Sequence, residues 1–210
     1  MGDNLNSQLA NVIRKTTKST VHFHRLRTML TTSKTICLLL TLLITACSTA
    51  SGQTKPSFEA RLKELKIELP PASKPIASYV TAVRTGNLVF LAGAGPVKNG
   101  KPIITGKVGS DVTEEQANKA ARETILISLA ALRAEIGSLD RVKRIVKLTG
   151  WVNSAPGFTR QPWVINGASD LLVEIFGDAG KHARSSVGAN ELPLNIPVEI
   201  ELVVEVLPGQ

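Results

Sequence analysis

The sequence contains few of the side chains that most often carry chemistry in proteins. Its 210 residues include two cysteines, three histidines and one tyrosine, and aromatic residues make up only 4% of the chain. Both cysteines, Cys37 and Cys47, lie near the N-terminus, so the chain beyond them offers no thiol for a nucleophile, a disulfide or a zinc site. His182 is the only histidine beyond His24, which disfavours a transition-metal site. We interpret His182 as a loop residue rather than a general base.

Positive charge is present, but it is concentrated near the N-terminus. The chain carries 25 Lys and Arg against 17 Asp and Glu, a formal net charge of +8. Six basic residues and one acidic residue precede Cys47, which leaves 19 basic and 16 acidic residues, or +3, for the remainder. So small an excess of charge, with few aromatic rings on which bases could stack, is not typical of nucleic-acid-binding proteins. We therefore expect no nucleic-acid partner.

The N-terminal segment is typical of an export signal. Residues 36–46 read ICLLLTLLITA, an apolar run of 11 residues with Lys34 just before it. The run is shorter than the roughly 20 residues that span a bilayer but has the length of a signal-peptide core. The following Ile44-Thr45-Ala46-Cys47 resembles the bacterial lipobox, whose cysteine is lipidated and becomes the new N-terminus. That resemblance implies lipidation of Cys47, and Ser48 after it implies the outer membrane.

These features predict three segments, a signal peptide at 1–46, a lipidated tether at 47–56 and a folded domain at 57–208. We expect an exported protein that its lipid anchors to the periplasmic face of the outer membrane. Two alternatives remain open: an uncleaved hydrophobic anchor, or an ordinary signal peptide cut near Ala50, which would leave a soluble periplasmic protein. Translation from Met29 would give a signal of ordinary length, so Met29 is a second candidate start.

The apolar pattern of the domain predicts strands that alternate with two long helices. Thr113 and Gln116 form a capping-box pattern ahead of an apolar stripe at spacings of three and four, and Gly137 follows the stripe as a helix stop. The continuous apolar run at 88–93 predicts a strand buried on both faces. In chain order, the expected elements are a short helix over 58–67, strands over 76–83 and 88–93, helix 114–136, strand 144–152, helix 164–176, and strands 184–189 and 197–207.

This order predicts an α+β fold with a mixed sheet, because strands both pair locally and alternate with helices. Two helices can cover only one face of such a sheet. The other face must therefore meet solvent or another subunit, which predicts association through the sheet.

Several strings in the domain resemble the RidA family, also called the YjgF or endoribonuclease L-PSP family, which has a chorismate-mutase-like fold. They are RTGNLVFLAG at 84–93, AEIGSLDRVKRIVK at 134–147, ARSSVG at 183–188, the Leu-Pro pair at 192–193 and VEIE at 198–201. The resemblance implies a homotrimer whose three intersubunit clefts bind small carboxylates. It further implies hydrolysis of reactive imines and enamines to 2-keto acids and ammonia, with no metal and no organic cofactor.

The resemblance also assigns site residues. It implies that Arg184 and Glu199 are catalytic, and that substrate is bound by Tyr79, Gly93, Asn166, Arg184 and Ser186. These residue types suit the reaction, because a guanidinium holds a carboxylate through two parallel hydrogen bonds. A carboxylate can then accept a proton from the water that attacks the imine. Simpler interpretations exist for three of them: an ion-pair partner for Arg184, a solvated stripe with Glu201 and Glu205 for Glu199, and packing for Tyr79.

The sequence departs from the usual family pattern at four places. Ala92-Gly93-Ala94 stands where Ser-Gly-Gln is typical, and Ser186 stands where cysteine is usual. Residues 188–191 read Gly-Ala-Asn-Glu in place of Glu-Val-Ala-Arg, and the segment 156–162 is longer than usual. The lost hydroxyl and amide favour an alternative function, a trimer that binds small carboxylates without turnover. Endoribonuclease activity is the least favoured of the three.

Overall fold

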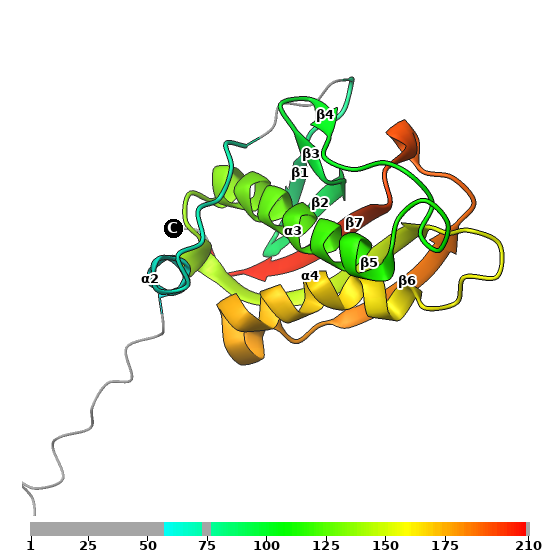
Figure 1. The fold of residues 1–210 in the computed structure, drawn as a ribbon. Helices are drawn as coiled ribbons and strands as arrows, with labels where there is room; N and C mark the ends of the chain where they lie inside the picture. Colours follow the sequence, from blue (N-terminus) through cyan, green and yellow to red (C-terminus); the bar gives the residue numbers. More distant parts are fainter. Residues whose placement is uncertain (1–56, 73–76, 209–210) are drawn as a thin grey trace, which may run out of the picture. The chain divides into compact units, whose positions relative to one another are not determined.

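The computed structural model describes residues 57–72 and 77–208 (Figure 1). Its main feature is a five-stranded sheet with the strand order β1-β2-β7-β5-β6. All neighbouring strands pair antiparallel except β5 and β6, which are parallel, so the sheet is mixed as predicted. The strands are β1 (Ala82–Thr85), β2 (Leu88–Ala94), β5 (Val142–Asn153), β6 (Ala183–Ala189) and β7 (Val198–Val206), and a separate hairpin pairs β3 (Val97–Lys98) with β4 (Lys101–Pro102). The predicted signal peptide at 1–46 and tether at 47–56 lie outside the described residues.

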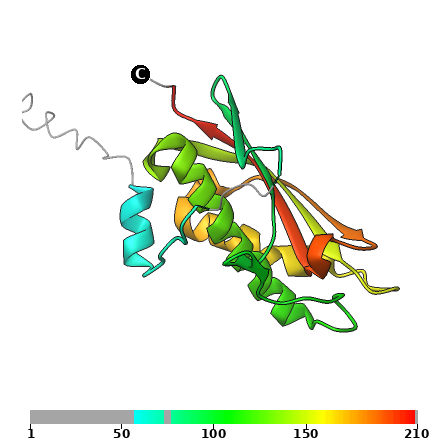
Figure 2. The ribbon, with the colours of Figure 1, turned by 90° about the horizontal axis from the view of Figure 1, so that it is seen from above.

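Two long helices, α3 (Glu114–Ile136) and α4 (Gln161–Phe176), cover one face of the sheet (Figure 2). The capping box that starts α3 forms as predicted: the Thr113 hydroxyl accepts from the Gln116 amide at 3.2 Å, and the Gln116 side chain accepts from the Thr113 amide at 2.9 Å. Gly137 ends the helix at a positive φ of 83°, as predicted for a residue without Cβ. The predicted apolar stripe is buried throughout: Ala121, Ile125, Leu129, Leu132 and Ile136.

The core lies between these helices and the sheet, and the opposite sheet face is open. In β7 every second residue, beginning with Val198, is buried against the helices, which is the alternation expected of a sheet covered on one face. Phe90 of β2 is 44% exposed although its neighbours Val89 and Leu91 are buried. The prediction that this strand is buried on both faces was therefore wrong, because both long helices pack on the same side.

Helix α4 makes the crossover that joins β5 to the parallel edge strand β6. A parallel pair needs such a crossover, and a helix supplies it. The helix approaches the sheet closely at Gly150, where an added Cβ would lie 2.6 Å from the Ile165 side chain. The helix begins at Gln161, earlier than the predicted residue 164, with Pro162 in its first turn, where the missing amide proton is tolerated. Polar residues of α4 thereby reach the edge strand.

The strand predicted over 76–83 is shorter and later than expected. Pairing in β1 runs from Ala82 to Thr85, and residues 77–79 form bends, so Tyr79 lies in an exposed loop and not in a strand. The physical reason is a bulge in the partner strand, where the pairing of β2 with β7 shifts between Leu91 and Ala94. The Ala92 amide still donates to the Thr81 carbonyl at 3.0 Å, and the regular pairing of β1 with β2 does not continue into the bulged segment.

The first helix, α2 (Phe58–Glu64), is also shorter than the predicted 58–67. Lys66 adopts a positive φ of 55°, and the Ile67 amide donates back to the Leu62 carbonyl at 2.9 Å. This is the helix-ending pattern in which a left-handed residue reverses the chain and an apolar residue packs back. Ile67 packs against the core accordingly. Over the described residues, no helix combines the length and the apolar character needed to cross a bilayer.

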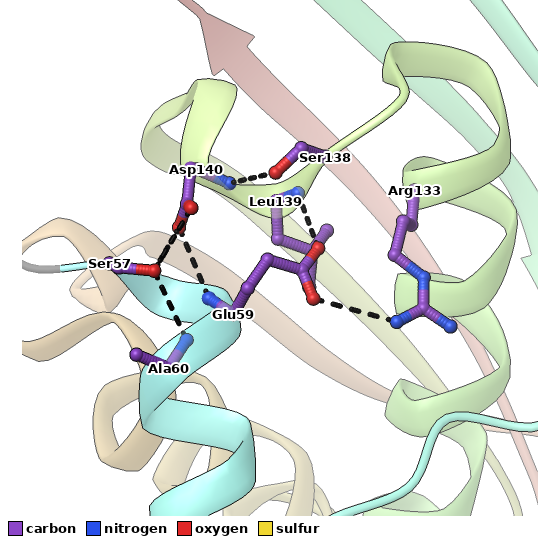
Figure 3. A network of polar contacts seen from close by, with 7 residues as sticks. All are labelled: Ser57, Glu59, Ala60, Arg133, Ser138, Leu139 and Asp140. Carbon is purple, nitrogen blue, oxygen red and sulfur yellow. Dashed lines mark hydrogen bonds and ion pairs between the residues drawn. The ribbon is translucent and has the colours of Figure 1, made fainter.

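Helix α2 is fixed to the body of the domain by two carboxylates that cap each other's segments (Figure 3). Asp140 accepts from the Ser57 hydroxyl at 2.9 Å and from the Glu59 amide at 3.1 Å, at the N-terminus of α2. Glu59 in return accepts from the Leu139 amide at 2.9 Å and lies 3.5 Å from the Arg133 guanidinium. Each carboxylate thus satisfies a helix-terminal amide of the other segment, where negative charge is favourable.

This reciprocal capping predicts a measurable contribution to stability. Replacing Asp140 by Ala leaves the Glu59 amide and the Ser57 hydroxyl without their acceptor, so we expect the free energy of unfolding to fall by about 1–2 kcal/mol. Chemical denaturation followed by circular dichroism measures this. Asp178→Ala is the matched control, because it removes an exposed carboxylate whose partner is the surface residue Lys181 and should leave the free energy of unfolding nearly unchanged. Equal losses in the two variants would contradict the capping role.

Candidate functional site

Arg184 lies on the edge strand β6 and faces the helices. In the sheet it is level with Leu148 of β5, which in turn pairs with Leu202 of β7, and both leucines are buried beneath α3 and α4. Its Nη1 donates to Oδ1 of Asn166 at 2.8 Å and to Oγ of Ser169 at 3.0 Å, both on α4. Within residues 57–72 and 77–208, its Nε and Nη2 make no hydrogen bond. These two N–H groups form an edge that suits bidentate binding of a carboxylate.

The hydrogen bonds continue from Arg184 to His182. Oγ of Ser169 lies 3.1 Å from Nε2 of His182, and Nδ1 of His182 lies 2.6 Å from the Gly180 carbonyl. Burial and, to a smaller extent, the charge of Arg184 lower the pKa of His182. The imidazole is therefore neutral at physiological pH.

Ser186 lies two residues along β6 from Arg184 and faces the same side. Its Oγ is buried, and among the described residues it is the one buried side-chain oxygen or nitrogen without a hydrogen-bond partner. Ser186 is level with Gly150, which Ile165 of α4 covers. Because native proteins satisfy most buried polar atoms, this hydroxyl is a candidate contact for a ligand that enters beside Arg184.

Glu199 lies on the other face of the sheet. It pairs with Trp151 of β5, which is level with Val187 of β6, and all three belong to the alternate set of residues that faces away from the helices. The Glu199 carboxylate lies directly over Gly93, so that an added Cβ at Gly93 would clash with it. Burial and, to a smaller extent, the nearby Glu201 raise the pKa of Glu199, which makes it a stronger base than an ordinary glutamate.

The predicted site residues therefore form two groups within one chain. Arg184, Asn166 and Ser186 meet on the helix-covered face at the edge strand, whereas Glu199 and Gly93 meet on the open face. Tyr79 joins neither group by a hydrogen bond among the described residues, and it lies in the loop before β1, 49% exposed. Cys47, the predicted lipidation site, lies outside the described residues. In the described part of the chain, no three His, Cys, Asp or Glu side chains lie close enough to hold a metal ion.

Comparison with known proteins identifies the family. The family model described as “YjgF/chorismate mutase-like, putative endoribonuclease” matches residues 59–206. The chain belongs to the YjgF family. The structure has the fold that the family resemblance predicts. Helices α3 and α4 cover one face of a mixed sheet, and helices and strands follow one another along the chain in the predicted order.

Two similar proteins match this chain over most of their own length. Protein TCP17 of Trypanosoma cruzi is 42% identical over 147 residues, which are 70% of this chain and 92% of that protein. A 2-iminobutanoate/2-iminopropanoate deaminase of Dermatophagoides farinae is 29% identical over 140 residues, which are 66% of this chain and 93% of that protein.

Two solved structures resemble the YjgF-family domain closely. One is a protein of unknown function from Agrobacterium tumefaciens, which is 42% identical with a TM-score of 0.66 and matches 71% of this chain and 92% of its own. The other is described as a putative endoribonuclease from Shewanella oneidensis, which is 32% identical with a TM-score of 0.69 and matches 72% of this chain and all of its own.

Sequence reasoning did not select two polar residues that the structure places beside Arg184. Ser169 lies three residues after Asn166 on α4, so both reach the same side of that helix. This spacing of three residues was the feature of the sequence that could have indicated Ser169. His182 stands two residues before Arg184, and its loop position is as predicted, but its contact with Ser169 depends on how α4 crosses the sheet.

Proposed function

We propose that this YjgF-family protein hydrolyses small imino acids to 2-keto acids and ammonia. The observation that carries the proposal is the guanidinium of Arg184, which Asn166 and Ser169 orient through one nitrogen while its bidentate edge stays available. A planar guanidinium held in this way fixes both the position and the plane of a substrate carboxylate. The similarity to a protein named as a 2-iminobutanoate/2-iminopropanoate deaminase supports the same reaction.

The chemistry needs only a positioned water and a base. The water oxygen forms a bond to the imine carbon, and the Glu199 carboxylate accepts the proton that this water loses. Both protons of the water end on the imine nitrogen, one by way of Glu199 and the other from the new hydroxyl group as the carbon–nitrogen bond breaks, so ammonia leaves and a 2-keto acid remains. The raised pKa of Glu199 suits this role, because a stronger base removes the proton more readily.

A site that uses both Arg184 and Glu199 needs two copies of the chain. The two side chains belong to opposite faces of one sheet, so a substrate held by Arg184 meets Glu199 from a neighbouring protomer. We propose the homotrimer that the family resemblance implies, assembled through the open face. That face carries exposed apolar side chains, which favour association: Val83, Phe90, Trp151 and Val187.

The direct test is hydrolysis of 2-iminobutanoate that an amino-acid oxidase generates from 2-aminobutanoate. The purified protein should release 2-oxobutanoate faster than buffer alone and reduce the amount of imine that semicarbazide traps. An unchanged rate with this imine and with the imines of alanine and leucine would refute the proposal.

The second candidate function is binding of small carboxylates without turnover. It is favoured by Ala92 and Ala94, whose side chains supply neither a hydroxyl nor a carboxamide beside Gly93 and Glu199. Isothermal titration calorimetry with 2-oxobutanoate distinguishes the two functions. Saturable binding together with no imine hydrolysis supports a binding protein, whereas turnover excludes a purely passive role.

A further inference from the structure

A directed chain of hydrogen bonds runs from Arg184 to the backbone through two side chains. The Gly180 carbonyl can only accept, so Nδ1 of His182, at 2.6 Å, must carry the proton. In the neutral ring Nε2 is then an acceptor, and the Ser169 hydroxyl at 3.1 Å donates to it. Since the Ser169 hydroxyl directs its hydrogen to His182, its oxygen lone pairs accept from Nη1 of Arg184 at 3.0 Å.

The donor and the acceptor of each hydrogen bond in this chain are determined. Arg184 cannot accept and the carbonyl of Gly180 cannot donate, so the hydroxyl of Ser169 and the tautomer of His182 are both determined. Asn166 is fixed in the same way, because only its Oδ1 can accept from Nη1 of Arg184 at 2.8 Å. The guanidinium is thus held on one nitrogen by two acceptors of fixed orientation, although it stands on an exposed edge strand.

We propose that His182 is a positioning residue, which acts through Ser169 to hold Arg184 in the orientation that receives a substrate carboxylate. This role rests on the proposed function, in which Arg184 binds that carboxylate. His182 touches neither substrate nor reacting atoms. A long exposed side chain without fixed partners loses conformational entropy when a ligand orders it, and this loss weakens binding. By holding Arg184 through Ser169 before the ligand binds, His182 reduces that loss.

The surroundings of His182 keep the hydrogen-bond chain intact at neutral pH. Burial of the ring is the main cause that lowers the pKa of His182, and the charge of Arg184 lowers it further, whereas the hydrogen bond to Gly180 acts in the opposite direction. The neighbouring charges Asp178 and Lys181 pair with each other at 2.7 Å on the surface, and Asp170, which follows Ser169 on α4, is exposed. A carboxylate bound to Arg184 would offset the positive charge and should therefore raise the pKa of His182.

Kinetics of four variants test the role. His182→Leu removes the acceptor for Ser169, and we expect KM for 2-iminobutanoate to rise about 3- to 10-fold while kcat changes less than about 2-fold. His182→Gln supplies an amide oxygen in place of Nε2 and should restore KM to within about 2-fold of the wild type. If His182 acts through Ser169, adding His182→Leu to Ser169→Ala should raise KM no further than Ser169→Ala alone. An unchanged KM in His182→Leu, no rescue by glutamine, or additive effects in the double variant would overturn the proposal.

A second measurement needs no turnover. In proton NMR titrations of the full chain, the His182 signals are those absent from His182→Gln, which separates them from His22 and His24. The pKa of His182 should rise in Arg184→Met, and in the wild type it should rise on saturation with 2-oxobutanoate. If the wild type neither hydrolyses imines nor binds 2-oxobutanoate, the proposed function fails, but the shift in Arg184→Met still decides whether the two side chains are coupled. No shift in that variant contradicts the positioning role whatever the enzyme assays show.

Discussion

Arg184→Ala should lower kcat/KM for 2-iminobutanoate by about 10³-fold while leaving the fold intact. In the proposed site, the substitution removes both hydrogen bonds between the guanidinium edge and the substrate carboxylate, and each bond between charged groups contributes about 1.5–3 kcal/mol. It also removes the positive charge that selects a carboxylate ligand. Steady-state kinetics with oxidase-generated imine measure the loss. Arg184→Lys keeps the charge without the planar fork, so we expect it to recover only a small part of the activity.

The control for Arg184 is Arg122→Ala on α3. Arg122 pairs with Glu174 at 2.9 Å, and both side chains are substantially exposed, so its removal should alter stability by no more than about 1 kcal/mol and leave kcat/KM unchanged. Circular dichroism and thermal unfolding of Arg184→Ala should match the wild type, because the arginine is exposed. Retention of more than about a tenth of the activity in a folded Arg184→Ala protein would remove Arg184 from the binding site.

Glu199→Gln should lower kcat by about 10²- to 10⁴-fold, the contribution of a positioned general base. KM should change little, since in the proposed mechanism the Glu199 carboxylate acts on the water and not on the substrate carboxylate. The same variant should be at least as stable as the wild type at pH 7. Burial and Glu201 disfavour the charged form of Glu199 in the folded state and so raise its pKa above the ordinary 4.5. The charged form therefore destabilises the fold, and a neutral amide removes that effect.

The raised pKa of Glu199 determines the direction in which both stability and kcat change with pH. Below about pH 4.5 the residue is protonated in both folded and unfolded chains, and it contributes no difference in stability. As pH rises through the folded-state pKa, the wild type loses stability that Glu199→Gln keeps. Activity follows the opposite course, because only the charged carboxylate accepts a proton, so kcat falls as pH drops through the raised value.

Glu201→Gln separates this explanation from a general effect of acid. Removing the like charge should lower the pKa of Glu199, so the acid limb of the kcat profile should move to lower pH with little change in the plateau. Glu205→Gln is the matched control, because it removes another glutamate of the same strand face, one that pairs with Lys143 at 2.7 Å. An acid limb that is unmoved in Glu201→Gln, or that moves equally in both variants, would contradict the assignment of the limb to Glu199.

Local sequence signals predicted the helices and the sheet better than they predicted the ends of strands. The capping box of Thr113 and Gln116 and the stop at Gly137 act within a few residues, and the structure has both. The start of β1 depends instead on a bulge in its partner at Leu91–Ala94, which is a property of pairing and not of the strand itself. The exposure of Phe90 likewise depends on both long helices packing on one side.

The candidate site was predictable only in part. The family resemblance indicated Arg184, Asn166 and Glu199, and the structure joins the first two by a hydrogen bond. It does not bring Glu199 to them, because residues of a strand alternate between faces and the sequence alone does not establish which faces two distant strands share. Lipidation of Cys47 and export stay predictions, since residues 1–56 lie outside the described part of the chain.

Mixed oligomers test directly whether Arg184 and Glu199 of neighbouring protomers form one site. Arg184→Ala and Glu199→Gln chains are co-expressed with different tags, and the protein that carries both tags is isolated. In a head-to-tail trimer with either composition, one cleft in three pairs an intact Arg184 with an intact Glu199 from its neighbour. We predict that this protein recovers about one third of the wild-type rate of imine hydrolysis, whereas each variant alone is nearly inactive. No recovery in oligomers that contain both chains would contradict a site shared between protomers.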